Sequence, residues 1–164
     1  MFHVHRASFG ANGDSTDDTQ VFPGTLDWTH HRVVERNGAD LAAPDRAIAG
    51  EWRKTIVLAA AFPGLVLQLQ PDWMWSLQLT PRGTNQVRIE SRVAVAPETL
   101  ASVDADTWLA ELFELIDQVN GEDRPVVEGI RASVDRPQFE RAPLAPLERN
   151  VFDFDRYIAT ELTR

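Results

Sequence analysis

The sequence predicts an α+β domain in which an antiparallel sheet is followed by long helices that pack on it. Apolar and polar residues alternate along three successive segments between residues 65 and 95, as they do in strands covered on one face. Further along, apolar residues recur every three or four positions, which is typical of amphipathic helices. A chain of 164 residues is long enough for one domain with its own core. Strands first and helices afterwards is the α+β order.

The predicted strands are separated by turn signals. Residues 65–70 form the first alternating segment, 73–80 the second and 87–95 the third, with Pro71-Asp72 and Pro81-Arg82-Gly83 as turns between them. An apolar run at residues 54–60 and a short segment around residues 32–35 add further strand candidates. The residues expected to share one face of the second strand are Trp73, Trp75, Leu77 and Leu79. We therefore expect an antiparallel meander with one covered face.

Two helices are predicted after Pro97. The first begins near Thr107, with Asp104 or Asp106 as its cap, and ends at Asn120-Gly121. The last covers residues 147–162. Its expected core-facing stripe is Val151, Phe154, Ile158 and Leu162.

Asp123 conflicts with the apolar pattern of the first helix. The stripe of that helix consists of Trp108, Leu112, Leu115, Ile116 and Val119. One more turn brings the stripe to Asp123, and then to Val127 and Ile130. A buried ionised carboxylate is costly unless it is paired, capped or bound to a metal. Spacing alone leaves two interpretations open: Asp123 is a metal ligand, or it is the N-cap of a second helix that starts after Asn120-Gly121.

Composition excludes several classes of function. The net charge of -9 argues against binding to nucleic acid or to anionic membrane surfaces. No apolar run approaches the roughly 20 residues of a membrane span, and the start of the chain has no signal-peptide pattern, so we expect a cytoplasmic protein. The absence of cysteine excludes disulfides, thiolate catalysis and a Cys-ligated iron–sulfur cluster within this chain.

Four histidines are candidate ligands. His3 and His5 lie in residues 1–20, a polar stretch that we expect to be a mobile segment ahead of the domain at residues 21–164. His30 and His31 are adjacent on a predicted strand. Adjacent strand residues point to opposite faces, so we expect these two to lie on a surface or a pocket wall rather than to bind one metal.

Three separated stretches carry a resemblance to a known family. They are Phe62–Pro71, Asn120–Arg131 and Ala142–Glu148, the last followed by Val151-Phe152 and the terminal helix. In this order and spacing they are similar to the catalytic domain of the large (alpha) subunit of Rieske-type ring-hydroxylating oxygenases. The similarity covers about residues 55–162. It implies a helix-grip fold, a curved antiparallel sheet wrapped around a long helix, with a C-terminal helix.

The resemblance also implies a mononuclear non-haem Fe(II) held by two histidines and one carboxylate. The carboxylate of the family falls on Asp123, which favours the metal interpretation of that residue. His5 matches the second histidine, and the first would then lie immediately before Met1. His3 is the weaker alternative, because it would put Ser8 at the second ligand position.

The implied activity is hydroxylation or dealkylation of a small organic, possibly aromatic, substrate with O2. Electrons would come from a Rieske centre and a reductase, and the family suggests a homotrimer. Because the chain has no cysteine, the 2Fe-2S cluster is expected only in a missing domain or a partner, and the chain resembles the C-terminal part of a longer subunit. Candidate substrate-binding residues on the strands are Leu67, Leu69, Trp73 and Trp75.

Two alternatives remain at this stage. A helix-grip module can bind a hydrophobic ligand without a metal, in which case Asp123 is a cap and the histidines are incidental. The chain could also be an inactive fragment. The sequence does not indicate the substrate or the choice between monooxygenase and dioxygenase chemistry.

Overall fold

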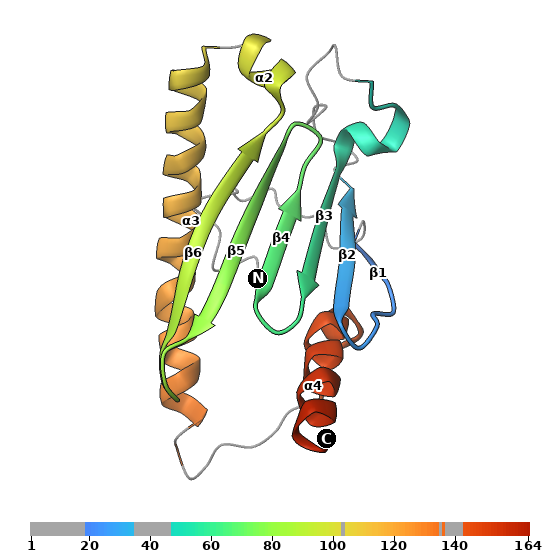
Figure 1. Ribbon diagram of the computed structural model, residues 1–164, viewed down its shortest axis with the longest axis vertical. Helices are drawn as coiled ribbons and strands as arrows, with labels where there is room; N and C mark the ends of the chain where they lie inside the picture. The colour runs from blue at the N-terminus through green and yellow to red at the C-terminus, as the bar shows by residue number, and fades with distance from the viewer. Residues whose placement is uncertain (1–18, 35–46, 103, 135, 137–142) are drawn as a thin grey trace. The chain divides into compact units, whose positions relative to one another are not determined.

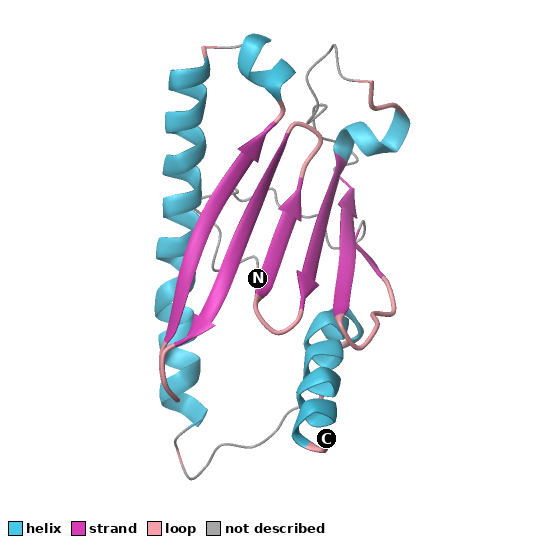
Figure 2. Ribbon diagram, viewed as in Figure 1, coloured by secondary structure: helices cyan, strands magenta, loops and turns pink. Residues whose placement is uncertain are grey.

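Six strands form one antiparallel sheet whose spatial order is the order of the chain (Figures 1 and 2). The structure is a computed structural model that describes residues 19–34, 47–102, 104–134, 136 and 143–164. The strands are β1 (Thr19–Val21), β2 (Trp28–Val34), β3 (Thr55–Ala61), β4 (Leu65–Leu69), β5 (Trp73–Pro81) and β6 (Val87–Val95). The alternating pattern therefore predicted β4, β5 and β6 closely. The 3₁₀ helix η2 (Gly50–Lys54) leads into β3.

The turn between β3 and β4 contains a close backbone approach that requires glycine. Phe62-Pro63 is a cis peptide, and Gly64 follows it. The backbone N–H of Leu79 on β5 donates to the carbonyl of Gly64 at 2.7 Å. A Cβ added to Gly64 would lie 2.5 Å from the carbonyl oxygen of Leu79, so only glycine lets β5 approach this turn.

The register of the strands assigns every side chain to one of two faces. Directly paired residues of antiparallel strands point to the same face. The row His31, Leu58, Gln68, Trp75 and Val93 therefore lies on one face, which we call the Trp75 face. The row Arg32, Val57, Leu69, Met74 and Ala94 lies on the other, which we call the Arg32 face. His30 and His31 point to opposite faces, as predicted.

The first predicted helix is longer than expected. Helix α3 runs without interruption from Ala105 to Val134, so the predicted break at Asn120-Gly121 is wrong. Asp104 caps its start, because its carboxylate accepts hydrogen bonds from the backbone N–H of Thr107 at 3.4 Å and from the Thr107 hydroxyl at 3.0 Å. The helix continues through this pair although both Gly121 and Pro125 have low helix propensity.

Helix α4 (Arg149–Leu162) follows the short 3₁₀ helix η3 (Pro146–Glu148) and contacts β2. The predicted stripe does not form its buried face: Leu162 is 82% exposed, and Val151, Phe154 and Ile158 are also exposed. The buried residue of α4 is Asp153, which is 0% exposed. The stripe residues are therefore not the buried side of this helix, although Phe154 still contacts Phe62 in the β3–β4 turn.

The chain divides into two compact units. One contains the sheet and α4, with residues drawn from 15–99 and 144–164. The other contains α3, within residues 100–143, and the short helix α2 (Pro97–Ser102) leads from one unit to the other. A six-stranded antiparallel sheet with a long helix and a C-terminal helix is the α+β class that the sequence predicts, and it is consistent with a helix-grip fold.

Candidate functional site

Asp123 lies in the interior of α3 and is exposed. The helix continues through it, so Asp123 is not the N-cap of a second helix. The buried residues of α3 are Leu112, Ile116 and Val119, one and more turns before it, whereas Val127 is 60% exposed. The burial that the apolar pattern predicted for Asp123 is therefore not present.

The other predicted iron ligand, His5, and its weaker alternative His3 lie outside the described residues. Within the part of the chain that the structure describes, no three His, Cys, Asp or Glu side chains come together as a metal site. The described residues therefore do not form a histidine–carboxylate metal site by themselves.

The four predicted substrate-binding residues lie on two strands and two faces. Leu67 and Leu69 of β4 are paired with Ser76 and Met74, so they point to the Arg32 face. Trp75 is paired with Gln68 and points to the Trp75 face, as does Trp73 two residues before it. All four are half-buried. The structure does not bring them together in one pocket.

Trp75 is held in place by a side-chain hydrogen bond. Its indole N–H donates to the hydroxyl of Ser91 on β6 at 2.7 Å. Ser91 is paired with Leu77, so the bond runs diagonally across the Trp75 face. This bond satisfies the polar atom of an otherwise apolar side chain and fixes the ring orientation.

A hollow of about 460 Å³ lies on the Arg32 face next to η2. Most of its lining is apolar: Ala47, Ile48, Ala49, Trp52, Thr55, Val57, Leu69, Gln70 and Pro71. The volume is within the range of small-molecule sites. Of the four predicted substrate-binding residues, Leu69 is the one in this lining.

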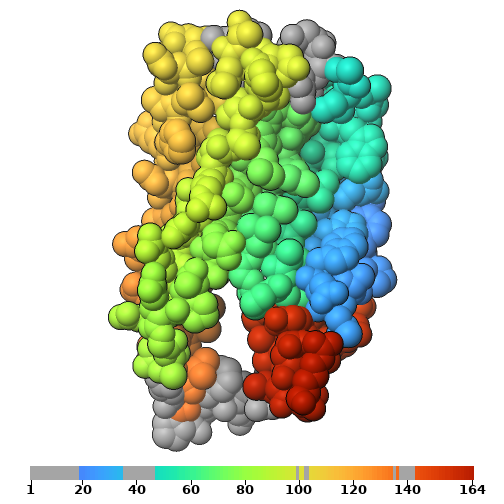
Figure 3. Space-filling model, viewed as in Figure 1, coloured from blue at the N-terminus to red at the C-terminus, as the bar shows by residue number. Residues whose placement is uncertain are grey.

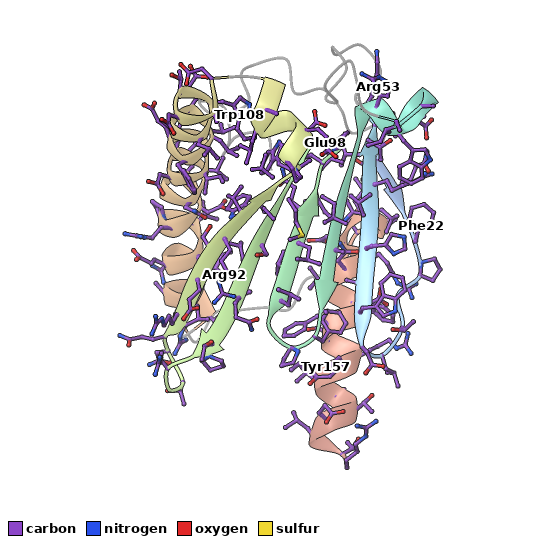
Figure 4. All side chains as sticks on the ribbon, turned by 45° about the horizontal axis from the view of Figure 1, so that its top comes forward. Phe22, Arg53, Arg92, Glu98, Trp108 and Tyr157 are labelled. Atoms are coloured by element: carbon purple, nitrogen blue, oxygen red, sulfur yellow. The ribbon has the colours of Figure 1, made fainter. Side chains whose placement is uncertain are left out.

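Arg32 stands beside the hollow within an aromatic cluster. Its guanidinium carbon lies 5.2 Å from the ring centroid of Trp52 and 5.3 Å from that of Phe22, which are cation–π distances. Phe22 also stacks on His30 at 4.8 Å, and Figure 4 shows it beside β2 at the edge of the sheet. A guanidinium N–H of Arg32 donates to the side-chain oxygen of Gln20. Arg32 also lies 4.0 Å from the carboxylate of Glu51 on η2, so the guanidinium is held by aromatic, amide and acidic groups together.

A second group of side chains, which we call the β2–α4 clasp, attaches α4 to the sheet. Its centre is the buried carboxylate of Asp153. One carboxylate oxygen of Asp153 accepts from the backbone N–H of Gly24 at 3.0 Å and lies 2.9 Å from the hydroxyl of Thr29. The other accepts from Nε of Arg149 at 2.9 Å. Three donors and one positive charge compensate the loss of water around this carboxylate.

Asn150 continues the clasp to His31. The side-chain amide of Asn150 lies between Thr29 and His31: its Oδ1 is 3.1 Å from the Thr29 hydroxyl, and its Nδ2 is 2.5 Å from Nδ1 of His31. Figure 3 shows the surface of α4 in direct contact with the β1–β2 edge of the sheet. Burial lowers the pKa of His31 below its usual value, and the neighbouring His30 adds to the effect.

Aromatic rings extend this attachment. Phe154 and Tyr157 of α4 each lie 5.4 Å from the ring of Phe62 in the β3–β4 turn, and Figure 4 labels Tyr157 on the helix. The sequence analysis missed Asp153, Thr29 and Asn150. One signal was available, since Asp153 shares with Asn150 and Phe154 the three- and four-residue spacing of a single helix face.

Comparison with known proteins gives one family. The family model described as ring hydroxylating alpha subunit (catalytic domain) matches residues 5–164. No curated protein matches the chain. Of the helices in the described part of the chain, none combines the length and hydrophobicity that crossing a membrane requires.

Proposed function

Since this chain belongs to the family of ring-hydroxylating alpha-subunit catalytic domains, we propose that it hydroxylates or dealkylates a small organic, possibly aromatic, substrate with O2. The observation that carries the proposal is the family match, which extends over residues 5–164. Electrons would reach the site from a Rieske centre and a reductase outside this chain, because the chain has no cysteine to hold the cluster. Assembly as a homotrimer is part of the same proposal.

We assign the iron ligands to His5 and Asp123, with His3 as the weaker alternative to His5. Imidazole and carboxylate are the donor types of a non-haem Fe(II) site, and Asp123 is an exposed carboxylate on a long, regular helix. When bound, the iron supplies the activation of dioxygen. The role of the chain is to hold the metal and to position an apolar substrate beside it.

The substrate-binding proposal separates into two surfaces. Leu67 and Leu69 serve the Arg32 face and its hollow, whereas Trp73 and Trp75 serve the Trp75 face. Leu69→Ala and Trp75→Leu distinguish them, because the substitution on the face that binds substrate will raise KM more than the other. Equal effects from both would contradict a site on either face alone.

Anaerobic titration with Fe(II) tests the metal assignment. We expect the native chain to bind iron in a stoichiometric amount, and Asp123→Ala and His5→Ala to lose it. Asp117→Ala is the matched control, since Asp117 is another exposed acid of α3. Loss of iron in Asp117→Ala as well, or no binding by the native chain, would contradict the proposed ligands.

The hollow supports a second candidate function, which is metal-free binding of a hydrophobic ligand. Its volume is about 460 Å³, its lining is largely apolar, and Asp123 does not belong to that lining. This candidate predicts that a hydrophobic fluorescent probe binds the iron-free native chain and binds the variant Trp52→Ala more weakly. A probe that binds both proteins equally would contradict it.

A further inference from the structure

The hydroxyl of Thr29 has one proton and two acceptors within reach. Asp153 Oδ2 lies 2.9 Å away and Asn150 Oδ1 lies 3.1 Å away. A threonine hydroxyl donates one hydrogen bond and can accept others. The carboxylate is the stronger acceptor, because a hydrogen bond to a charged group is shorter and stronger than one between neutral groups. The Thr29 hydroxyl therefore donates its hydrogen bond to the carboxylate of Asp153.

This assignment determines the orientation of the Asn150 amide. The Thr29 hydroxyl proton points to Asp153, so a lone pair of the Thr29 oxygen points to Asn150. An amide oxygen of Asn150 at this place would face that lone pair, whereas an amide N–H would donate a hydrogen bond to it. A half-turn of the amide places its NH₂ next to Thr29 and its oxygen next to Nδ1 of His31. The contact at 2.5 Å then joins an oxygen acceptor to Nδ1. Such a contact is favourable when Nδ1 carries a proton.

We propose that the hydrogen bonds of the β2–α4 clasp form one chain in which every donor has a fixed direction. In this chain neutral His31 carries its proton on Nδ1, and Nε2 is unprotonated. His31 can therefore gain a second proton at Nε2 while α4 stays attached to the sheet. In this chain His31 Nδ1–H donates to Asn150, Asn150 N–H donates to Thr29, and Thr29 O–H donates to Asp153. Arg149 and the backbone of Gly24 anchor the far end at Asp153.

The surroundings of His31 agree with this order. Among the described residues, the buried histidine nitrogen without a hydrogen bond is Nδ1 of His30, not Nε2 of His31. The strand partners of His31 are Val21 on β1 and Leu58 on β3, neither of which is charged. Among the described residues, the charged or titratable groups on the elements that adjoin it include His30 and Arg32 on β2 and the pair Asp153 and Arg149 on α4. In the proposed order, Nε2 is the ring nitrogen of His31 that is left to accept a proton.

Nitrogen-15 NMR of the histidine side chains in the full chain tests the proposal. In neutral His31 we expect the Nδ1 signal of a protonated nitrogen and the Nε2 signal of an unprotonated one. On acidification Nε2 gains the proton, and the amide of Gly24, which donates to Asp153, stays protected from hydrogen exchange. A neutral His31 protonated at Nε2 would overturn the proposal, as would loss of Gly24 protection when His31 titrates.

Two variants test the order of the chain. Thr29→Val removes the hydroxyl that orients Asn150, so we expect the share of His31 protonated at Nδ1 to fall toward that of a free imidazole. Thr29→Ser keeps the hydroxyl and is expected to keep the native signals. An unchanged tautomer in Thr29→Val would show that Thr29 does not order the chain. If Thr29→Val does not fold, the tautomer of the native protein still decides.

Discussion

Asp153 is the single residue on which the position of α4 depends most. It is 0% exposed, and its carboxylate meets Gly24, Thr29 and Arg149. Asp153→Ala leaves these three donors without their acceptor, and we expect it to lower the free energy of unfolding by about 2–4 kcal/mol. Urea unfolding followed by tryptophan fluorescence measures the loss.

Asp155→Ala is the control for this prediction, because Asp155 is an exposed acid on the same helix. Its effect should stay within about 0.5 kcal/mol. Equal effects of the two substitutions would show that Asp153 acts only through the charge of the helix and not through the clasp.

Position 24 requires glycine because the clasp leaves no space there for a side chain. A Cβ at this position would collide with the Asp153 carboxylate and would lie 2.8 Å from the carbonyl oxygen of Trp28. We expect Gly24→Ala to destabilise the protein by about 1–3 kcal/mol. Gly129→Ala in α3 meets nothing within 4 Å and should stabilise by about 0.5–1 kcal/mol. Thermal unfolding of both variants compares a crowded with an open glycine, and a stabilising Gly24→Ala would contradict the clasp geometry.

His31 gives the clasp a defined pH dependence. Its pKa in the folded protein is lowered from 6.5, chiefly by burial. Below pH 6.5 the unfolded chain binds a proton that the folded chain does not, so stability falls as the pH decreases and levels off below the folded pKa. The slope is at most about 1.4 kcal/mol per pH unit. We expect His31→Gln to lose this part of the pH dependence between pH 7 and pH 5 in urea-unfolding series, and an unchanged profile would contradict the assignment.

At the scale of elements, α3 shows where local sequence signals mislead. Asn120-Gly121 predicted a helix end and Asp123 a new N-cap, yet the helix continues from Ala105 to Val134. Pro125 has no N–H, so the carbonyl of Gly121 has no partner four residues on. The continuous helix therefore contains a weak turn between Gly121 and Pro125, and Asp123 lies within it.

Pro125→Ala separates the two interpretations of this segment. In a continuous helix the substitution adds a hydrogen bond and removes a clash, so we expect a gain of about 1–3 kcal/mol in the free energy of unfolding. If a new helix began at Asp123, Pro125 would occupy its first turn, where proline is favourable, and the substitution would bring no gain. Circular dichroism during thermal unfolding distinguishes the outcomes.

Strands were more predictable than helices for a physical reason. Alternation of period two between turn signals predicted the bounds of β4, β5 and β6 from local sequence, although Val87 and Ile89 of β6 are exposed. Helix α4 has an equally clear apolar stripe, but that stripe is exposed. Asp153 lies 129 residues from Gly24 and 124 from Thr29, and local spacing does not identify partners that are so far apart in the chain.

At the scale of the whole molecule, the sequence predicted the α+β class and the family, whereas the proposed iron site stays a prediction that rests on donor types. The rows across the sheet place Leu69 and Trp75 on opposite faces, which a list of apolar residues cannot reveal. The proposed iron site combines His5, near the start of the sequence, with Asp123 on α3, so it would depend on how distant segments come together. Composition and spacing constrain its chemistry but not its assembly.

Iron binding should therefore couple distant parts of the chain and stabilise all of it. If His5 and Asp123 hold Fe(II) only in the folded state, free iron at 100 times its Kd adds about 2.7 kcal/mol of stability. For a chain of this length that corresponds to a rise in Tm of about 5–10 °C. Anaerobic calorimetry measures the rise, and removal of iron with a chelator should reverse it.

Two variants make this prediction specific to the proposed ligands. Asp123→Ala should show the Tm of the iron-free protein whether or not iron is present, whereas Asp117→Ala should respond to iron as the native chain does. An iron-induced rise that persists in Asp123→Ala would place the metal elsewhere in the chain. A native chain whose Tm does not respond to iron, but does respond to a hydrophobic ligand, would favour the metal-free candidate, because binding to the hollow also stabilises only the folded sheet.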